Sequence, residues 1–402
     1  MGRSAFLQRA CVGVVVLGGW AAGVGDHAAW AAPITPGNLV IYRAGSGTNT
    51  LANTGNNVFL DEYTTAGVLV QSIAMPATGT GTKLITSGIS TGEGPLSISP
   101  DGTWIGFSGY NSTIPAGSSI SAATSATVPR VAGVFNTTTG SYSLTVMGTW
   151  FSAASPRGVA TTDGNQIWAN GANSGVVYGA VDGATPFQAS GTTANSTSIG
   201  TNTRVLGQYG NQLYISAAGG TLPTVGQLAG NPLVNGLPTG NTFLPNIPRQ
   251  GGTPATSSRY GFTFLDTNPA VPGIDTMYTV DDSNTSGGLW KYTLGSSGTW
   301  NAAGSITALT GLLRGLTGGV DGSDVKLFMT GSGNTLWTYT DTTAATSTLS
   351  GTLSAFTSLA TAASLTAFRG VVLVPVPEPG TTGMLAAGAI GAAVVRWRRR
   401  KA

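Results

Sequence analysis

The sequence predicts an all-β body that is rich in turns, on the evidence of its composition and its short alternating apolar runs. Charged residues make up only 8% of the 402 residues, whereas hydrophobic residues make up 41% and glycine occurs 61 times. Helices favour Ala, Leu, Glu and Lys, but this chain is built largely from Gly, Ser, Thr and Asn. Because it also holds nine Trp, eleven Tyr and twelve Phe, it can bury an aromatic core. A helix bundle and a disordered chain are therefore both excluded.

Short β-type runs follow one another from about residue 38 to residue 374, separated by clusters of turn-forming residues. Some of these runs recur in order. The run 163–168 (DGNQIW) resembles 210–214 (GNQLY), and 288–293 (GLWKYT) resembles 335–340 (TLWTYT). Apolar and polar residues alternate in each run, which indicates half-buried strands beside turns.

A recurring arginine precedes these runs and sets the length of the repeat. It recurs at intervals of 47 to 55 residues, at Arg157, Arg204, Arg259, Arg314 and Arg369. Glu93 occupies the corresponding place in a sixth copy near residues 94–97. Repeats of this length with several strands each are typical of a β-propeller. We therefore expect a propeller of about six blades, with seven as the alternative.

The first and last strands are expected to complete one blade together. In this arrangement strand 368–374 pairs with N-terminal strands near 39–43, 58–63 and 68–73. If the arginines open the innermost strands, they all reach one rim of the central channel, with Glu93 beside them. Such a rim either attracts anionic polymers such as uronic-acid polysaccharides, or braces each blade against the next.

Catalytic and metal sites receive little support from the residues of the body. Asp61, Glu62 and Glu93 are the carboxylates considered for acid–base chemistry, but their spacing does not pair them. The acidic clusters at 281–284 and 321–324 do not fit a calcium loop, so turns explain them better. The aromatic residues of the repeats either stack on sugars or pack between blades; they are Trp168, Trp290 and Trp337. We expect no metal and no cofactor.

The N-terminus has the features of a secretory signal peptide, assigned to residues 1–31. Two arginines precede an apolar stretch, and Ala29-Trp30-Ala31 supplies the small residues that signal peptidase requires. Cleavage there removes Cys11 and His27, the only cysteine and the only histidine. The mature chain then has no thiol nucleophile, imidazole base or His/Cys zinc site, which favours a protein that is not an enzyme.

The C-terminus has three parts in a fixed order. A linker over 375–379 contains Pro377, Glu378 and Pro379, and an apolar segment over 380–395 follows it. A helix of that length is about 24 Å long, which makes a short transmembrane helix. The tail 396–402 then carries the basic residues Arg396, Arg398, Arg399, Arg400 and Lys401. These cations are expected to stay in the cytoplasm, so the body lies outside the inner membrane.

This order of parts resembles the PEP-CTERM sorting signal of Gram-negative bacteria that produce extracellular polysaccharide. The resemblance implies recognition by an exosortase, a membrane processing enzyme, and release of the body to the cell surface or the extracellular space. It covers only residues 376–402. A plain tail anchor, which would leave a permanent inner-membrane protein, is the alternative.

These features predict an exported protein with a transient inner-membrane stage. With the seven terminal cations, Asp26 and Glu378 set aside, eleven basic and thirteen acidic residues remain in the body, which excludes a nucleic-acid partner. We expect a non-catalytic binding or structural propeller associated with extracellular polysaccharide. The alternative is a secreted carbohydrate-active enzyme on the same scaffold.

Overall fold

The computed structural model describes residues 31–189, 202–210, 212–217, 225–229, 236, 240–242, 258–282, 287–307, 313–331 and 334–377. The described part is all-β, as the composition predicts, with one short 3₁₀ turn, Leu353–Ala355. Among these residues no helix is both long and apolar enough to cross a membrane. Most of the predicted signal peptide, Glu378, Pro379, the segment 380–395 and the basic tail lie outside the described residues.

The strands form antiparallel units of four, each running from an inner strand to an outer one. Four of these units are separate sheets. The first contains β9 (Pro156–Thr161), β10 (Gln166–Gly171), β11 (Val176–Ala180) and β12 (Gln188–Ala189). The second contains β13 (Thr203–Tyr209), β14 (Gln212–Ala217), β15 (Val225–Ala229) and β16 (Gly240–Thr242). The third contains β17 (Arg259–Leu265), β18 (Thr276–Asp281), β19 (Gly288–Leu294) and β20 (Trp300–Thr307). The fourth contains β21 (Leu313–Asp321), β22 (Asp324–Gly331), β23 (Thr335–Asp341) and β24 (Thr357–Thr361).

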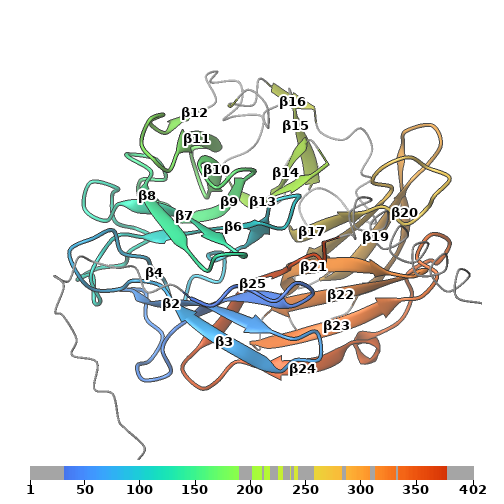
Figure 1. The fold of residues 1–402 in the computed structure, drawn as a ribbon, viewed down its shortest axis with the longest axis horizontal. Coiled ribbons are helices and arrows are strands. Elements are labelled where there is room, and N and C mark those ends of the chain that lie inside the picture. Colours follow the sequence, from blue (N-terminus) through green and yellow to red (C-terminus); the bar gives the residue numbers. More distant parts are fainter. Residues whose placement is uncertain are drawn as a thin grey trace, which may run out of the picture. The chain divides into compact units, whose positions relative to one another are not determined.

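The remaining strands form a nine-stranded sheet in which two further groups of four are joined by β4 (Ile85–Thr86). One group contains β5 (Ser97–Ile98), β6 (Trp104–Tyr110), β7 (Arg130–Asn136) and β8 (Tyr142–Val146). The other contains β25 (Ala367–Leu373), β1 (Leu39–Ala44), β2 (Asn56–Tyr63) and β3 (Leu69–Ala74). The C-terminal β25 is thus paired with the N-terminal β1, as the sequence predicts, with Leu39 opposite Leu373 (Figure 1).

The inner strands contact one another in series. Contacts run from β5 to β9, then to β13, β17, β21 and β25, and from β25 back to β5. The apolar clusters lie between neighbouring units, so that Phe262, Phe264 and Leu316 are buried in one cluster. Each unit therefore buries one face against the next, as repeat architectures require.

A glycine in the inner strand allows this close approach at several of the joints. A Cβ atom at Gly158 would lie 2.8 Å from the amide nitrogen of Leu206 in the next inner strand. At Gly261 the corresponding atom is the amide nitrogen of Leu316, also at 2.8 Å. At Gly370 it is the amide nitrogen of Leu96, and the carbonyl oxygen of Gly94 would lie 2.6 Å away. Because real Cβ atoms do not approach backbone this closely, only glycine fits. The recurring glycine is therefore the packing element of the repeat.

Turns between the first and second strands of a unit explain the recurring Asp-Gly dipeptides. In the β9–β10 turn, an oxygen of Asp163 accepts hydrogen bonds from the amides of Asn165 and Gln166, both at 2.8 Å. Before β6, Asp101 accepts one from the amide of Thr103 at 3.0 Å. Such turns fix where each second strand begins.

Candidate functional site

Two cavities lie along the inner strands. We call the first the arginine cavity; it measures about 420 Å³, and Arg314 and Arg369 line it. The second, which we call the exit cavity, measures about 690 Å³, and residues 372–376 line it. Both cavities are lined by Leu96, Val205 and Leu316. These three apolar side chains therefore mark the boundary between the two spaces.

The inner strands run in the same direction past both cavities. Tyr260 and Gly261 in the first half of β17 line the arginine cavity, whereas residues 262–265 line the exit cavity. In β21, Arg314 lines the first cavity and residues 317–321 line the second. The arginine cavity is thus at the N-terminal end of the inner strands, and the exit cavity is at their C-terminal end.

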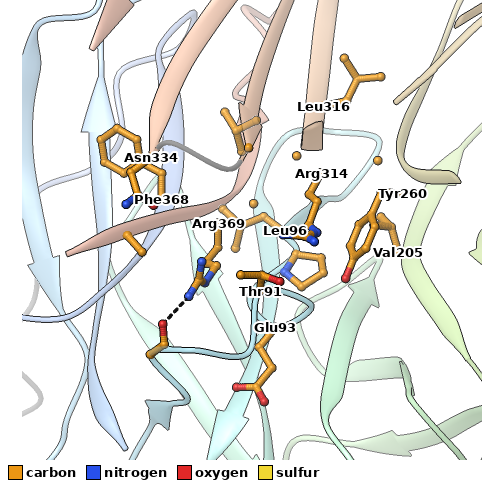
Figure 2. Close-up of a pocket in the computed structure, with 18 of the residues that line it drawn as sticks. Thr91, Glu93, Leu96, Val205, Tyr260, Arg314, Leu316, Asn334, Phe368 and Arg369 are labelled. Carbon is orange, nitrogen blue, oxygen red and sulfur yellow. Dashed lines mark hydrogen bonds between the residues drawn. The ribbon is translucent and has the colours of Figure 1, made fainter. Parts of the chain in front are cut away.

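Arg314 and Arg369 extend from β21 and β25 into the arginine cavity. Figure 2 shows both guanidinium groups on the side of Thr91 and Glu93, away from Leu316. Arg314 donates from Nε to Oδ2 of Asp282 at 2.9 Å, and Arg369 donates from Nη2 to the carbonyl of Gly88 at 2.8 Å. Burial lowers the pKa of Arg369, the Glu93 carboxylate opposes this change, and the charge of Arg314 adds to it. The two cations therefore lie close enough to repel each other.

Arg157 and Arg204 lie beside this cavity, around the ring of Tyr260. The guanidinium carbon of Arg204 is 4.7 Å from the ring centroid, and that of Arg314 is 5.6 Å from it. Arg157 donates from Nη1 to the carbonyl of Thr203 at 2.6 Å. Burial lowers the pKa of Arg157, Tyr260 raises it, and the neighbouring Arg204 lowers it. The structure thus brings four of the five predicted arginines to one end of the inner strands.

Arg259 lies elsewhere, although the sequence interval places it in the same ring. Its guanidinium stacks over Trp290 at 4.3 Å, and Nη1 is 3.4 Å from Oδ2 of Asp281 in its own sheet. The reason is a shift of one residue. Arg157, Arg314 and Arg369 directly precede a glycine, and Arg204 precedes Val205, but in β17 Tyr260 has the place before Gly261. Because successive strand residues point to opposite faces, Tyr260 lines the cavity and Arg259 turns away from it.

Glu93 lines the arginine cavity as a carboxylate that is fully engaged by donors. Its Oε1 accepts hydrogen bonds from the hydroxyls of Tyr110 at 2.7 Å and Ser155 at 2.9 Å. Its Oε2 accepts from the hydroxyl of Thr86 at 3.0 Å and the amide of Ser87 at 2.9 Å. Burial raises the pKa of Tyr110, and the charge of Glu93 raises it further. This carboxylate therefore fixes the loop that carries it.

Several polar atoms around the arginine cavity are buried without a hydrogen-bond partner among the described residues. They are the Nε atoms of Arg157, Arg204 and Arg369, and the hydroxyl of Tyr260. Tyr260 is only 2% exposed. Buried donors of this kind are rare in folded proteins, because each one carries an uncompensated desolvation cost. A bound anion or water at this end of the inner strands would give these four groups their partners.

The other candidates from the sequence have structural partners. Asp61 pairs with Arg43 at 2.5 Å, and Glu62 accepts hydrogen bonds from Asn38 and Gln71, both at 2.6 Å. The tryptophans lie inside the fold, where Trp168 and Trp290 are buried and Trp337 packs against a core cluster. Within the described ranges, no group of three Asp, Glu, His or Cys side chains is placed to hold a metal ion.

Sequence reasoning missed two buried cations that brace the fold. Arg130, fully buried on β7, donates to the carbonyls of Val128 at 2.6 Å and Ala123 at 2.7 Å. Lys291 on β19 donates from Nζ to Oδ2 of Asp341 at 2.7 Å, which links two neighbouring sheets. Arg130 lies outside the recurring runs, and Lys291 stands in the run 288–293 where the run 335–340 has Thr338, so the repeat gives no signal for either cation.

The described chain leaves the body directly before the sorting motif. Val374 is the last residue that the backbone holds, because its amide donates to the carbonyl of Asn38 and its carbonyl accepts from the amide of Gly37. Val376 and Pro377 are exposed.

Comparison with known proteins identifies the C-terminal segment. The family model of the PEP-CTERM protein-sorting motif matches residues 375–400. This chain is therefore an exported protein with a C-terminal sorting signal of the kind that exosortase-type enzymes process, and it is destined for secretion or the cell surface.

Comparison of the whole chain adds two similar solved structures. The periplasmic gluconolactonase PpgL of Pseudomonas aeruginosa is 15% identical, with 75% of this chain and 78% of that chain covered and a TM-score of 0.42. A protein from Lactobacillus plantarum is 11% identical, with 84% and 85% covered and a TM-score of 0.43. No curated protein matches the chain.

Proposed function

We propose that this exported protein is a six-bladed β-propeller that binds an anionic saccharide of the extracellular matrix in its arginine cavity. The observation that carries the proposal is that Arg314 and Arg369 line this cavity while Arg157 and Arg204 lie beside it around Tyr260. Three of these four arginines have a buried Nε atom, and Tyr260 has a hydroxyl, that lack partners among the described residues. A carboxylate or sulfate group would supply acceptors to such donors.

The way the units are joined supports a count of six blades. Each four-stranded unit corresponds to one blade, and the pairing of β25 with β1 makes the first blade from both ends of the chain. Packing at the inner strands supports closure, because Gly370 lies directly against Gly94 at the joint between the last inner strand and the first. Six units account for the strands in the described ranges, apart from β4, which joins two of them.

The shape of the arginine cavity favours a short or terminal piece of saccharide over a threaded polymer. Its volume is in the range typical of small-molecule sites. Leu96, Val205 and Leu316 line both cavities, so a chain entering between the arginines meets apolar side chains where the two cavities adjoin.

The carboxylates near the cavity support binding over glycoside hydrolysis. A glycosidase of the common type uses two carboxyl groups on either side of the scissile bond. Glu93 is the one carboxylate among the described residues that line the arginine cavity, and four donors occupy its oxygens. A binding protein needs no such pair.

Export is proposed to pass through an inner-membrane intermediate. The segment 380–395 anchors the chain, the basic residues after it remain in the cytoplasm, and an exosortase-type enzyme then cleaves near Pro377-Glu378-Pro379. Mass spectrometry of the surface or secreted protein tests this route. We expect a C-terminus close to the motif, whereas a surface protein that still ends at Ala402 would contradict it.

Binding is tested by titration calorimetry of the purified protein with acidic and neutral oligosaccharides. We expect acidic saccharides to bind, with an affinity that falls as the salt concentration rises. Replacing Arg314 or Arg369 by Gln removes a charged hydrogen bond worth about 1.5–3 kcal/mol, so affinity should fall about 10- to 100-fold.

The matched control is Arg43→Gln. Arg43 also pairs with an aspartate, and its side chain is 14% exposed compared with 18% for Arg314, but it is not among the residues that line the arginine cavity. This variant should be destabilised without losing affinity. Unchanged binding in both cavity variants would mean that these arginines brace one blade against the next and do not bind the saccharide.

A further inference from the structure

We infer that, in the anchored precursor, the mouth of the exit cavity faces the bilayer and the arginine cavity opens away from it. This inference rests on the membrane-anchored stage of the proposed function. It concerns the orientation of the body, which neither the sorting motif nor the fold class specifies.

The direction of the inner strands is the first step. The inner strands that line the cavities all run from the arginine cavity to the exit cavity, and β25 is the last of them. After β25, Val374, Pro375 and Val376 line the exit cavity. The chain therefore leaves the body at the end opposite to Arg314 and Arg369.

The length of the connection is the second step. Val374 is held by backbone hydrogen bonds of 2.9 and 2.8 Å, and the apolar segment begins six residues later, at residue 380. Six residues span at most about 20 Å when fully extended. Pro375, Pro377 and Pro379 lie in this stretch, and proline restricts both its own backbone and that of the preceding residue. The connection is thus too short to let the body turn over freely.

The chemistry of the exit face is compatible with a nearby lipid surface. Val376 is 67% exposed and Val320 is 49% exposed, and both line the mouth of this cavity. The charged side chains that line it among the described residues are Asp321 and Lys326, which balance each other. An apolar rim without net charge is not repelled by an anionic membrane.

The orientation leaves the binding end free. While the chain is still anchored, the arginine cavity opens away from the membrane, so a saccharide could reach it before processing. This gives the short connection a role beyond the display of the sorting motif.

Fluorescence energy transfer to the membrane tests the orientation. The full chain, purified from the membranes of a host that lacks exosortase and carrying Cys11→Ser, is reconstituted into phosphatidylcholine vesicles with an acceptor-labelled headgroup. A donor dye is attached at Val320→Cys on the exit face or at Ile89→Cys, which lines the arginine cavity and is 60% exposed. We expect higher transfer efficiency from position 320 than from position 89. Equal or reversed efficiencies overturn the inference.

Two controls separate the orientation from the anchoring. Inserting 30 Gly/Ser residues between Val376 and Pro377 gives a flexible linker, and we expect it to reduce the difference between the two dye positions. A difference that survives the insertion would show that the short connection does not set the orientation. Failure of the chain to float with vesicles overturns the anchored stage itself, whereas floating protein with equal transfer overturns the orientation alone.

Discussion

Replacing Gly370 by Ala tests the packing that closes the series of inner strands. The new Cβ atom would lie 2.6 Å from the carbonyl oxygen of Gly94 and 2.9 Å from the carbonyl carbon of Pro95. The same residue donates its amide to the Gly94 carbonyl at 2.9 Å. Overpacking of this kind costs about 1–3 kcal/mol, and the hydrogen bond adds about 0.5–1.5 kcal/mol. We therefore expect the variant to lose about 2–4 kcal/mol in free energy of unfolding.

The assay is equilibrium urea unfolding of the purified protein, followed by tryptophan fluorescence. The control is Gly81→Ala, because no atom lies within 4 Å of a Cβ there and its φ is outside the left-handed region, as at Gly370. We expect that control to be neutral or stabilised by about 0.4–1 kcal/mol. If the two variants unfold within 0.5 kcal/mol of each other, the close approach of β25 to residues 94–96 is refuted.

Four further predictions concern buried charge and pH. Lys291→Met leaves the buried carboxylate of Asp341 without its cation, so it should lower the free energy of unfolding by about 3–5 kcal/mol. The double variant with Asp341→Asn should lose less than the sum of the two single variants. Additive losses in urea unfolding would contradict a direct pair. Burial raises the pKa of both Tyr209 and Tyr214 to about 12. Stability should therefore hold up to pH 10 and fall as pH rises towards 12, because the unfolded state ionises first. Burial alone would raise the pKa of Glu62, but hydrogen bonds from Gln71, Asn38 and Thr35 lower it, so stability should also fall as pH drops below about 4.5. Since the body contains no histidine, thermal unfolding between these limits should depend little on pH, and a steep change near pH 6.5 would contradict this account.

The sequence was informative where local chemistry decides the structure. The turn at Asp163 depends on neighbouring residues, so the sequence predicts where the next strand begins. The alternation of 288–293 predicts a half-buried strand, which is wrong: residues 288–292 are all buried, because the polar Lys291 pairs with Asp341 of the neighbouring sheet. The pairing of β25 with β1 also followed from sequence, because the repeat begins within a unit and leaves one strand to be completed from the other end.

The sequence was less informative where a side chain's partner is distant in the chain. An alignment of the repeats on arginine hides the one-residue shift by which Arg259 is separated from Gly261. An alignment on Gly261 instead puts Tyr260 directly before the glycine, where it lines the cavity. The donors to Glu93 come from residues 86, 87, 110 and 155, and no spacing rule connects these positions. The separation of the two cavities at Leu96, Val205 and Leu316 likewise arises only when three inner strands meet.

A crystal structure of the protein with a bound acidic oligosaccharide tests the proposed binding site most directly. We predict density in the arginine cavity, with an acidic group of the sugar within about 2.7–3.2 Å of the guanidinium nitrogens of Arg314 or Arg369. Density at any other surface, with these two arginines still bonded only to Asp282 and the Gly88 carbonyl, would contradict the proposed binding site.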